Sequence, residues 1–387
     1  MITVCKENMC TGCMACVEVC NKDAIKIIDS IKSYNALIEE AKCIGCNKCK
    51  HVCQNNERVE LKKPQSWHQG WSENETIRTR AASGGLASSL MKAFIEKKEG
   101  YVCGCTFVEG EFQFKITNQT SEIHCFAGSK YVKSNPKGIY KEIKKLLKNG
   151  KNVLFVGLPC QVAGLKKYIG RWNSNLYTVD LICHGTPSPI LLDKYLNEHN
   201  VDLKDIKDLR FREKSNFCLS DVYTPITNRD IPDSFLFAFL KSLIYTDNCY
   251  NCNYAEENRV SDITLGDSWG SALPVEDQKK GISLIMCQNE KGEELLDLSE
   301  VHLENVERKI AMEHNGQLNS PASHNSKRNL VFKRIENGER FDRIIFKLYP
   351  GIFIRQYIKF VLKKIKIIRR EGSLIRYGLF YKVDEND

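Results

Sequence analysis

The spacing of apolar residues predicts strands and helices that follow one another through the middle of the chain. The runs YVCGCTFV (101–108) and EFQFKIT (111–117) have the composition of β-strands, and apolar residues alternate with polar ones in the second run. Apolar residues recur at helical spacing from Leu86 to Phe94, and another helix is predicted near 138–149.

Two further segments are typical of a buried strand, a turn and a helix in succession. They are NVLFVGLPCQVAGLKKYI (152–169), with Cys160 in its turn, and NLYTVDLICHGTPSP (175–189), with Cys183 and His184 in its turn. This alternation favours an α/β fold with parallel strands. Because open α/β sheets bind ligands beyond the carboxyl ends of their strands, Cys160 and Cys183 are candidate site residues.

The segments on either side of this core differ from it in pattern. Residues 59–80 are polar and show no periodicity, which predicts a linker. The basic extension 311–387 contains a predicted helix with one apolar stripe, formed by Ile354, Ile358, Val361, Leu362, Ile365 and Ile368. An anionic membrane or a partner could cover this stripe, but we expect it to pack on the chain's own domain.

Length and composition are typical of a globular protein with two or three domains. The chain has 387 residues, of which 42% are hydrophobic. No run of eighteen apolar residues predicts a transmembrane helix, and the start MITVCKENMCTGC does not resemble a signal peptide. We therefore expect a cytoplasmic protein, in which 18 cysteines favour metal binding over disulfides.

The net charge of +9 is unevenly distributed. Residues 354–370 contain seven Lys or Arg and no acidic residue. Such a segment suits nucleic acid or an anionic membrane surface. We favour a solvated helix face and predict no nucleic-acid partner, with peripheral membrane contact through this helix as the open alternative.

Half of the cysteines lie in the first 53 residues, in two copies of one pattern. The copies CTGCMACVEVC and CIGCNKCKHVC are related by a shift of 33 residues, which indicates an internal repeat. The spacing C-x-x-C-x-x-C brings three thiolates to one [4Fe–4S] cubane, and in two-cluster proteins the last cysteine of each run binds the other cluster. The predicted ligands are Cys10, Cys13, Cys16 and Cys53 for one cluster, and Cys43, Cys46, Cys49 and Cys20 for the other.

This segment resembles bacterial two-cluster ferredoxins. Gly12 and Gly45 stand where the backbone must pass close to inorganic sulfide, whereas Asn21 and Gln54 replace the proline that usually follows each fourth cysteine. Zinc ribbons or a disulfide knot are the weaker alternatives. Cys5 fits neither copy, so we expect it to be an ordinary buried thiol.

A separate pair, Cys249 and Cys252, lies in NCYNCNYA (248–255). A C-x-x-C pair chelates one edge of a metal centre, and Cys160 and Cys183 could complete it. Four thiolates suit a third cubane or a zinc ion. The alternative is two buried free thiols and an unrelated pair, and spacing alone does not decide between them.

Small residues precede the helix that begins near Leu86. The turn of Ser83, Gly84 and Gly85 could present N–H groups to an anion such as a pyrophosphate, although Gly-Gly before a helix is more often only a turn. The sequence has no G-x-G-x-x-G after a strand and no Walker A motif, so neither a Rossmann NAD site nor a P-loop is expected. The neighbours Cys183 and His184 do not make a nucleophilic dyad.

Six short motifs together resemble the beta-subunit family of coenzyme F-420 hydrogenases and dehydrogenases. The resemblance runs from about residue 75 to residue 310. Its motifs are ASGGLASSL (82–90), AGSKYVKSNP (127–136), VGLPCQ (156–161), DLICHG (180–185), CYNC (249–252) and DITLGDSWG (262–270).

This resemblance implies an FAD-binding α/β domain that carries its own [4Fe–4S] cluster. It implies that Cys160, Cys183, Cys249 and Cys252 hold that cluster. It places flavin contacts on Ser83, Gly84, Gly85, Gly128, Ser129, Lys130 and Tyr131, with Asp267 and Trp269 as further lining residues. Lys130 would pair with the pyrophosphate or with the negative charge of the reduced flavin.

The sequence therefore predicts an α+β ferredoxin-like module at 1–58, a linker at 59–80, an α/β flavin-binding domain at 81–310 and a helical extension at 311–387. We expect a flavin-dependent iron–sulfur oxidoreductase that exchanges electrons with a redox partner protein or small carrier. The clusters would pass these electrons to FAD and then to a hydride acceptor such as coenzyme F-420, or in reverse. The alternatives are an electron-relay subunit without a substrate site of its own and, less favoured, a zinc-stabilised interaction protein.

Overall fold

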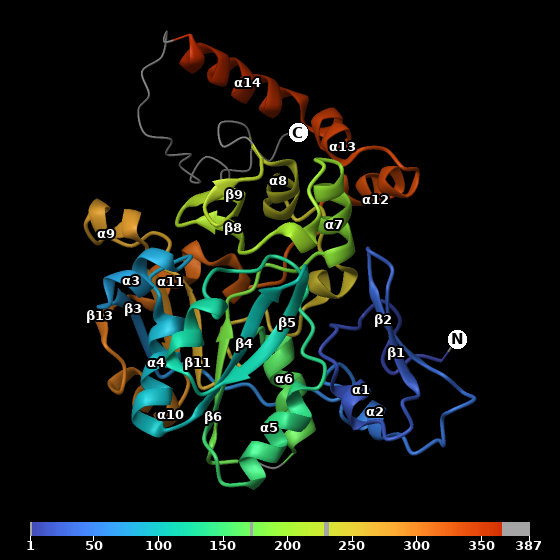
Figure 1. Cartoon of the computed structure of the whole chain (residues 1–387), viewed down its shortest axis with the longest axis vertical. Helices are drawn as coiled ribbons and strands as arrows, with labels where there is room; N and C mark the ends of the chain where they lie inside the picture. Colours follow the sequence, from blue (N-terminus) through green and yellow to red (C-terminus); the bar gives the residue numbers. More distant parts are fainter. Residues whose placement is uncertain (1, 171–172, 228–231, 366–387) are drawn as a thin grey trace.

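A sheet of eight strands forms the centre of the molecule (Figure 1). The structure is a computed structural model, and it describes residues 2–170, 173–227 and 232–365. The strand order is β13-β3-β12-β11-β7-β6-β4-β5. The strands are β3 (Ser66–Ser72), β4 (Tyr101–Val108), β5 (Glu111–Thr117), β6 (Val153–Gly157), β7 (Leu176–Leu181), β11 (Ile263–Asp267), β12 (Ser283–Cys287) and β13 (Val301–Asn305).

The sheet is mixed, with a parallel centre. Strands β4, β6, β7 and β11 are parallel neighbours, whereas β5, β12, β3 and β13 each pair in antiparallel fashion. The expected α/β core is therefore confirmed for the four central strands. Parallel strands are joined by crossover helices that cover both faces of the sheet, which explains why β6 is continuously apolar and why β7 is buried along nearly its whole length.

The segment 59–80 is not a linker, because it contributes β3 and the helix α3 (Glu75–Arg80). β3 pairs with β12 on one side and with β13 on the other. Both of its partners lie more than two hundred residues further along the chain, so the local sequence does not show the pairing. A polar strand of this kind is stabilised by its neighbours rather than by its own propensity.

Helices cover both faces of the sheet, and β6 shows how successive residues divide between them. Val153 and Phe155 belong to the core under α5 and α6, whereas Leu154 and Val156 belong to the core under α4. The bounds are α4 (Leu86–Lys98), α5 (Ile139–Lys148), α6 (Pro159–Ile169), α9 (Val275–Lys280), α10 (Glu290–Asp297) and α11 (Arg308–His314).

The N-terminal module packs beside α5 and α6 (Figure 1). Its elements are α1 (Ala15–Val19), β1 (Ile25–Asp29), β2 (Tyr34–Ile38) and α2 (Lys48–His51). The buried carboxylate of Glu18 accepts the backbone N–H groups of Gly138 at 2.9 Å and Lys141 at 2.8 Å. This places a negative charge at the N-terminus of α5, which a helix dipole favours, and fixes the module to the sheet.

A second body of helices lies above one end of the sheet, around its own apolar core (Figure 1). It contains the small antiparallel sheet β10-β9-β8. Its elements are α7 (Pro189–Asn197), β8 (Leu209–Glu213), β9 (Asn216–Asp221), β10 (Thr224–Pro225), α8 (Ser234–Leu240), α12 (Arg328–Glu336) and α13 (Phe341–Leu348). Short 3-10 helices cover Thr120–Phe126 (η1), Leu203–Asp205 (η2), Asp247–Asn251 (η3) and Gly316–Leu318 (η4).

The last described helix, α14 (Pro350–Lys364), extends away from this body (Figure 1). We expected its apolar stripe to be packed, but Ile354, Ile358, Val361 and Ile365 are exposed and Leu362 is only half-buried. Ile368 lies outside the described residues. The expectation is wrong because α14 attaches through its first turns, where Phe353 packs on Phe237.

Within the described ranges, no helix has both the length and the apolar character needed to cross a membrane.

Candidate iron–sulfur and flavin sites

The two cysteine repeats form loops with the same backbone conformation. Gly12 and Gly45 have φ of 72° and 71°, and Met14 and Asn47, two residues further on, are left-handed as well. The N–H of each glycine donates to the sulfur two residues earlier, at 3.4 Å in both loops. Each loop then continues into a short helix, α1 or α2. The repeat found in the sequence is therefore a structural repeat.

The first predicted ligand set surrounds one cavity. Cys10, Cys13, Cys16 and Cys53 all line it, and all are buried. Burial raises the pKa of Cys13 to about 11 and also raises the pKa of Cys16, whose sulfur is close to those of Cys13 and Cys53. The structure thus brings together the cysteines that the crossed pattern assigns to one cluster, and we name this cavity site 1.

The second ligand set, named site 2, lies nearer the surface. Cys49 is buried, Cys20 is half-buried, and Cys43 and Cys46 are exposed. Burial raises the pKa of Cys49, and the nearby sulfurs of Cys20 and Cys43 raise it further. Cys20 therefore lies beside the opposite repeat, as the crossed pattern requires.

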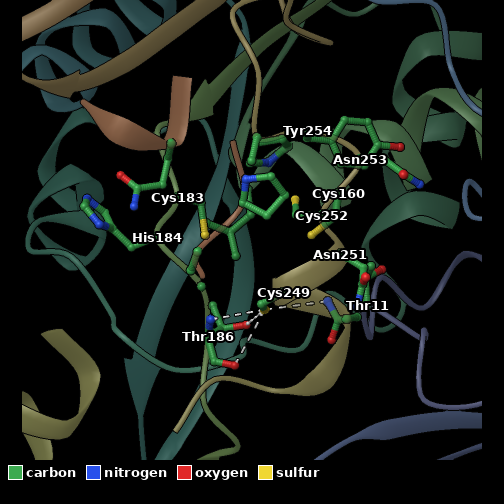
Figure 2. A pocket seen from close by; sticks show the side chains of 18 of the residues that line it. Thr11, Cys160, Cys183, His184, Thr186, Cys249, Asn251, Cys252, Asn253 and Tyr254 are labelled. Atoms are coloured by element: carbon green, nitrogen blue, oxygen red, sulfur yellow. Dashed lines mark hydrogen bonds between the residues drawn. The ribbon is translucent and has the colours of Figure 1, made fainter. Parts of the chain in front are cut away.

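The remaining four candidate cysteines line a single pocket, named site 3 (Figure 2). Cys160 lies in the first turn of α6, which begins at Pro159, and not in the preceding turn. Cys183 follows β7, and Cys249 and Cys252 come from η3 and the residue after it. Burial raises the pKa of Cys183 to about 12, and the sulfurs of Cys249 and Cys252 contribute to the shift.

Hydrogen-bond donors surround the sulfur of Cys249. The Thr186 N–H donates to it at 3.4 Å (Figure 2), and the Asn248 side-chain amide donates to it at 3.6 Å. The Thr246 hydroxyl lies 3.6 Å from the same sulfur and donates to the Thr186 carbonyl oxygen. N–H groups that donate to a ligand sulfur are a recurring feature of iron–sulfur sites, where they tune the cluster potential. The chemistry of this donor set fits a cluster ligand better than a packed thiol.

Within the described ranges, no three side chains of the His, Cys, Asp or Glu type converge tightly enough to hold a single metal ion. A single zinc ion takes thiolates about 2.3 Å from one point. A [4Fe–4S] cubane instead binds one thiolate at each of its four iron atoms, so its ligands lie farther apart.

Sites 1 and 3 are neighbours. A methyl group at Gly164 of α6 would lie 2.9 Å from Cys13 Sγ, so α6 packs directly on the first cysteine loop. Cys13 and Cys160 are close enough to raise the pKa of Tyr254, although burial is the main cause of that shift. The Tyr254 hydroxyl donates to Gln54, which follows Cys53. Tyr254, which lines site 3, therefore also contacts the chain next to site 1.

The turn of Ser83–Gly85 packs closely on the sheet. The Gly84 N–H donates to Ser283 Oγ at 3.0 Å, and a methyl group at Gly84 would lie 2.5 Å from the Gly70 carbonyl oxygen. Gly85 has φ of 91° at the N-terminus of α4. Packing and backbone conformation therefore account for both glycines, and their contact with a flavin stays a prediction.

The second predicted flavin stretch, like the first, lies against side chains of β8. Lys130 Nζ donates to the carbonyl oxygens of Phe126 and Ala127, each at 3.0 Å, and desolvation lowers its pKa to about 8. The ring of Tyr131 stacks on Phe239. A methyl group at Gly128 would lie 2.5 Å from a guanidinium nitrogen of Arg210, so glycine permits the close approach of β8.

Cations on β8 and in the turn directly after it contact the two stretches, and sequence reasoning missed them. Arg210 donates to the Arg80 carbonyl oxygen at 3.1 Å, and Lys214 donates to the Ser83 carbonyl oxygen at 2.8 Å. Arg212 donates to the Ala82 carbonyl oxygen and forms a 2.6 Å ion pair with Asp267. The alternation of cations in LRFREK was the available signal: Arg210 and Arg212 are alternate residues of β8, and Lys214 follows in the turn after the strand.

The two remaining predicted lining residues, Asp267 and Trp269, lie at and after the end of β11. Asp267 ends β11, and its carboxylate is paired with Arg212. His184 is half-buried near this pair, and burial lowers its pKa to about 4. Trp269 is half-buried in the loop after β11.

Comparison with known proteins bears on part of the chain. Residues 150–309 match the family described as the C terminus of the coenzyme F420 hydrogenase/dehydrogenase beta subunit. This chain segment belongs to that family. The match includes all four cysteines of site 3 and also Asp267, and it excludes the two cysteine repeats and the Ser83 and Lys130 stretches.

No curated protein matches the sequence. Among solved structures, a chain of the F420-reducing [NiFe] hydrogenase complex from Methanosarcina barkeri, studied by xenon derivatization, is 18% identical with a TM-score of 0.48. The alignment covers 71% of this chain and 93% of that chain. A likeness at this level supports no conclusion about this protein.

Proposed function

We propose that the chain is an iron–sulfur flavoprotein that transfers electrons through three [4Fe–4S] clusters to or from FAD and a hydride acceptor such as coenzyme F-420. The family match supports a redox role in electron transfer. The cofactors, the number of clusters and the acceptor are parts of the proposal.

The observation that carries the proposal is the convergence at site 3. Cys160, Cys183, Cys249 and Cys252 are separated by up to 92 residues, and they line one pocket beside the first cysteine loop. Four buried free thiols that served only to pack the core would need neither to line a common pocket nor to accept hydrogen bonds from N–H groups. Thiolates from different elements are the ligands that a cubane takes.

The three sites differ in exposure in the order that a relay needs. Site 2 reaches the surface through Cys43 and Cys46, and Ile44 between them is 67% exposed. Site 1 is buried between site 2 and α6. We propose that electrons enter or leave at site 2 and pass through site 1 to site 3. The chain supplies spacing, insulation from water and hydrogen bonds to sulfur, which set cluster potentials.

We propose that FAD binds where β8 meets the loops around Ser83 and Lys130. Arg210 and Arg212 lie on this strand and Lys214 directly follows it, and cations suit the two phosphates of the dinucleotide. Bound FAD would convert single electrons into a hydride. The residues themselves bind and orient it, and no side chain acts as a nucleophile.

A second candidate function is an electron relay with no substrate site of its own. The exposed loop at Ile44 and the exposed face of α14 favour it, because a relay must dock partners. Isolated protein, reduced with dithionite, is mixed anaerobically with coenzyme F-420 and with artificial hydride acceptors. Reduction of an acceptor supports the oxidoreductase, whereas no reduction together with electron transfer to a partner enzyme supports the relay.

We also propose that α14 makes a peripheral contact with an anionic membrane surface. Ile354, Tyr357, Ile358, Val361 and Ile365 are exposed at helical spacing. Arg355 and Lys359 are exposed as well, and α14 contains no acidic residue. An apolar stripe accompanied by basic residues suits a helix that lies in a bilayer interface.

A further inference from the structure

Site 1 contains one more sulfur than a cubane can bind. Cys5, which fits neither repeat, lines the same cavity as Cys10, Cys13, Cys16 and Cys53. Its thiol is close to those of both Cys10 and Cys53. A cubane takes one protein thiolate at each of four corners, so one of the five sulfurs must remain unbound.

The backbone holds Cys5 at this position. The residues just before it pair with β2. The Val4 N–H donates to the Ala36 carbonyl oxygen at 2.9 Å, and Thr3 forms a β-bridge with Leu37. The Asn56 side chain donates to the Val4 carbonyl oxygen at 3.0 Å, which ties the segment to the chain that follows Cys53. The proximity of Cys5 and Cys53 is therefore built into the fold of the module.

The internal repeat supplies a natural comparison. A shift of 33 residues takes Cys5 to Ile38 and takes Cys53 back to Cys20. Ile38 is partly buried against the module's core and has no sulfur. Site 2 thus has the four cysteines of its ligand set, with an apolar residue at the position that corresponds to the fifth sulfur of site 1.

We propose that Cys5 is an exchangeable ligand of site 1, which takes the place of Cys53 when that sulfur is lost or released. In the exchange, the bond from iron to Cys53 breaks, the bond from iron to Cys5 forms, and the Cys5 proton passes to the Cys53 sulfur. No electron is gained or lost. This inference rests on the proposed function, because it requires a cluster at site 1.

The test compares iron content in matched variants of the full chain purified without oxygen. Cys53→Ser removes the crossed ligand of site 1, and Cys20→Ser removes the crossed ligand of site 2. With three clusters, wild type contains about twelve irons per chain. We expect C53S to keep about twelve with an altered electron paramagnetic resonance spectrum after dithionite reduction, and C20S to fall to about eight.

The double variant C5S/C53S isolates Cys5. We expect it to lose about four irons relative to C53S, while C5S alone keeps the wild-type content. Equal iron loss in C53S and C5S/C53S, with wild-type circular dichroism, would overturn the inference. If C53S does not fold, C10S and C5S/C10S replace the pair, because Cys10 also lies close to Cys5. Absence of iron from wild type would instead refute the proposed function itself.

Discussion

Cys249 combines burial with two N–H donors to its sulfur, from Thr186 and Asn248, which makes it the most informative single residue of site 3. We predict that Cys249→Ser removes about four irons per chain, because a cubane needs four corners bound. The signals of the two N-terminal clusters should persist. Iron and acid-labile sulfide analysis with electron paramagnetic resonance measures both.

Cys287 is the matched control for this substitution. It is fully buried in β12 and does not line site 3. Cys287→Ser should lower stability without changing the iron content. If C249S retains its full iron content, Cys249 is not a ligand.

Lys130 gives a pH-dependent prediction at the same scale. Desolvation lowers its pKa to about 8, so between pH 8 and its usual value of 10.5 the unfolded chain binds a proton that the folded chain does not. The free energy of unfolding should therefore rise with pH in this range. K130M lacks this contribution. The free energy of unfolding of wild type minus that of K130M should therefore increase toward high pH. Urea unfolding of the apoprotein at several pH values measures it, and a constant difference would contradict the assigned pKa.

At the scale of elements, the contact between α6 and the first cysteine loop joins two parts of the chain. A methyl group at Gly164 would meet Cys13 Sγ at 2.9 Å and Cys13 Cβ at 3.0 Å. We predict that Gly164→Ala costs roughly 1–3 kcal/mol in the free energy of unfolding and slows electron transfer from site 1 to site 3. Denaturant unfolding and stopped-flow reduction of the flavin would measure these effects.

Gly351 in α14 is the control, because a methyl group there would meet nothing within 4 Å. Gly351→Ala should leave both the stability and the transfer rate near their wild-type values. Equal behaviour of G164A and G351A would show that α6 and the loop do not pack as described.

The apolar face of α14 is the second element with a measurable consequence. Replacing Ile358 or Val361 by Glu should weaken binding to vesicles of phosphatidylglycerol and phosphatidylcholine by roughly tenfold or more, because each variant loses an exposed apolar side chain that would enter the bilayer interface. Cosedimentation measures the binding. Val275→Glu, at an exposed apolar position of α9, is the control. Wild type that ignores anionic vesicles would refute the membrane contact.

For the whole molecule, short-range patterns carried most of the successful predictions. The elements at β4, β5, α5, β6, β7 and α7 follow from local periodicity, and the cysteine loops follow from spacing. The sequence alone did not decide whether Cys160, Cys183, Cys249 and Cys252 meet, because that depends on how β7 and η3 approach in three dimensions.

Long-range pairing explains what the sequence did not reveal. β3 was mistaken for a linker because its partners are β12 and β13, far along the chain. The cations of β8 were missed because their relation to the 80–83 loop is tertiary. The exposed stripe of α14 shows that amphipathic periodicity indicates a helix without indicating what covers it.

The most direct test of the account is the quantification of iron, acid-labile sulfide and flavin together in protein purified without oxygen. Three cubanes and one FAD predict about twelve irons, about twelve sulfides and one flavin per chain, with signals of reduced clusters after dithionite. A colourless protein without iron, and without a paramagnetic signal on reduction, would contradict the account.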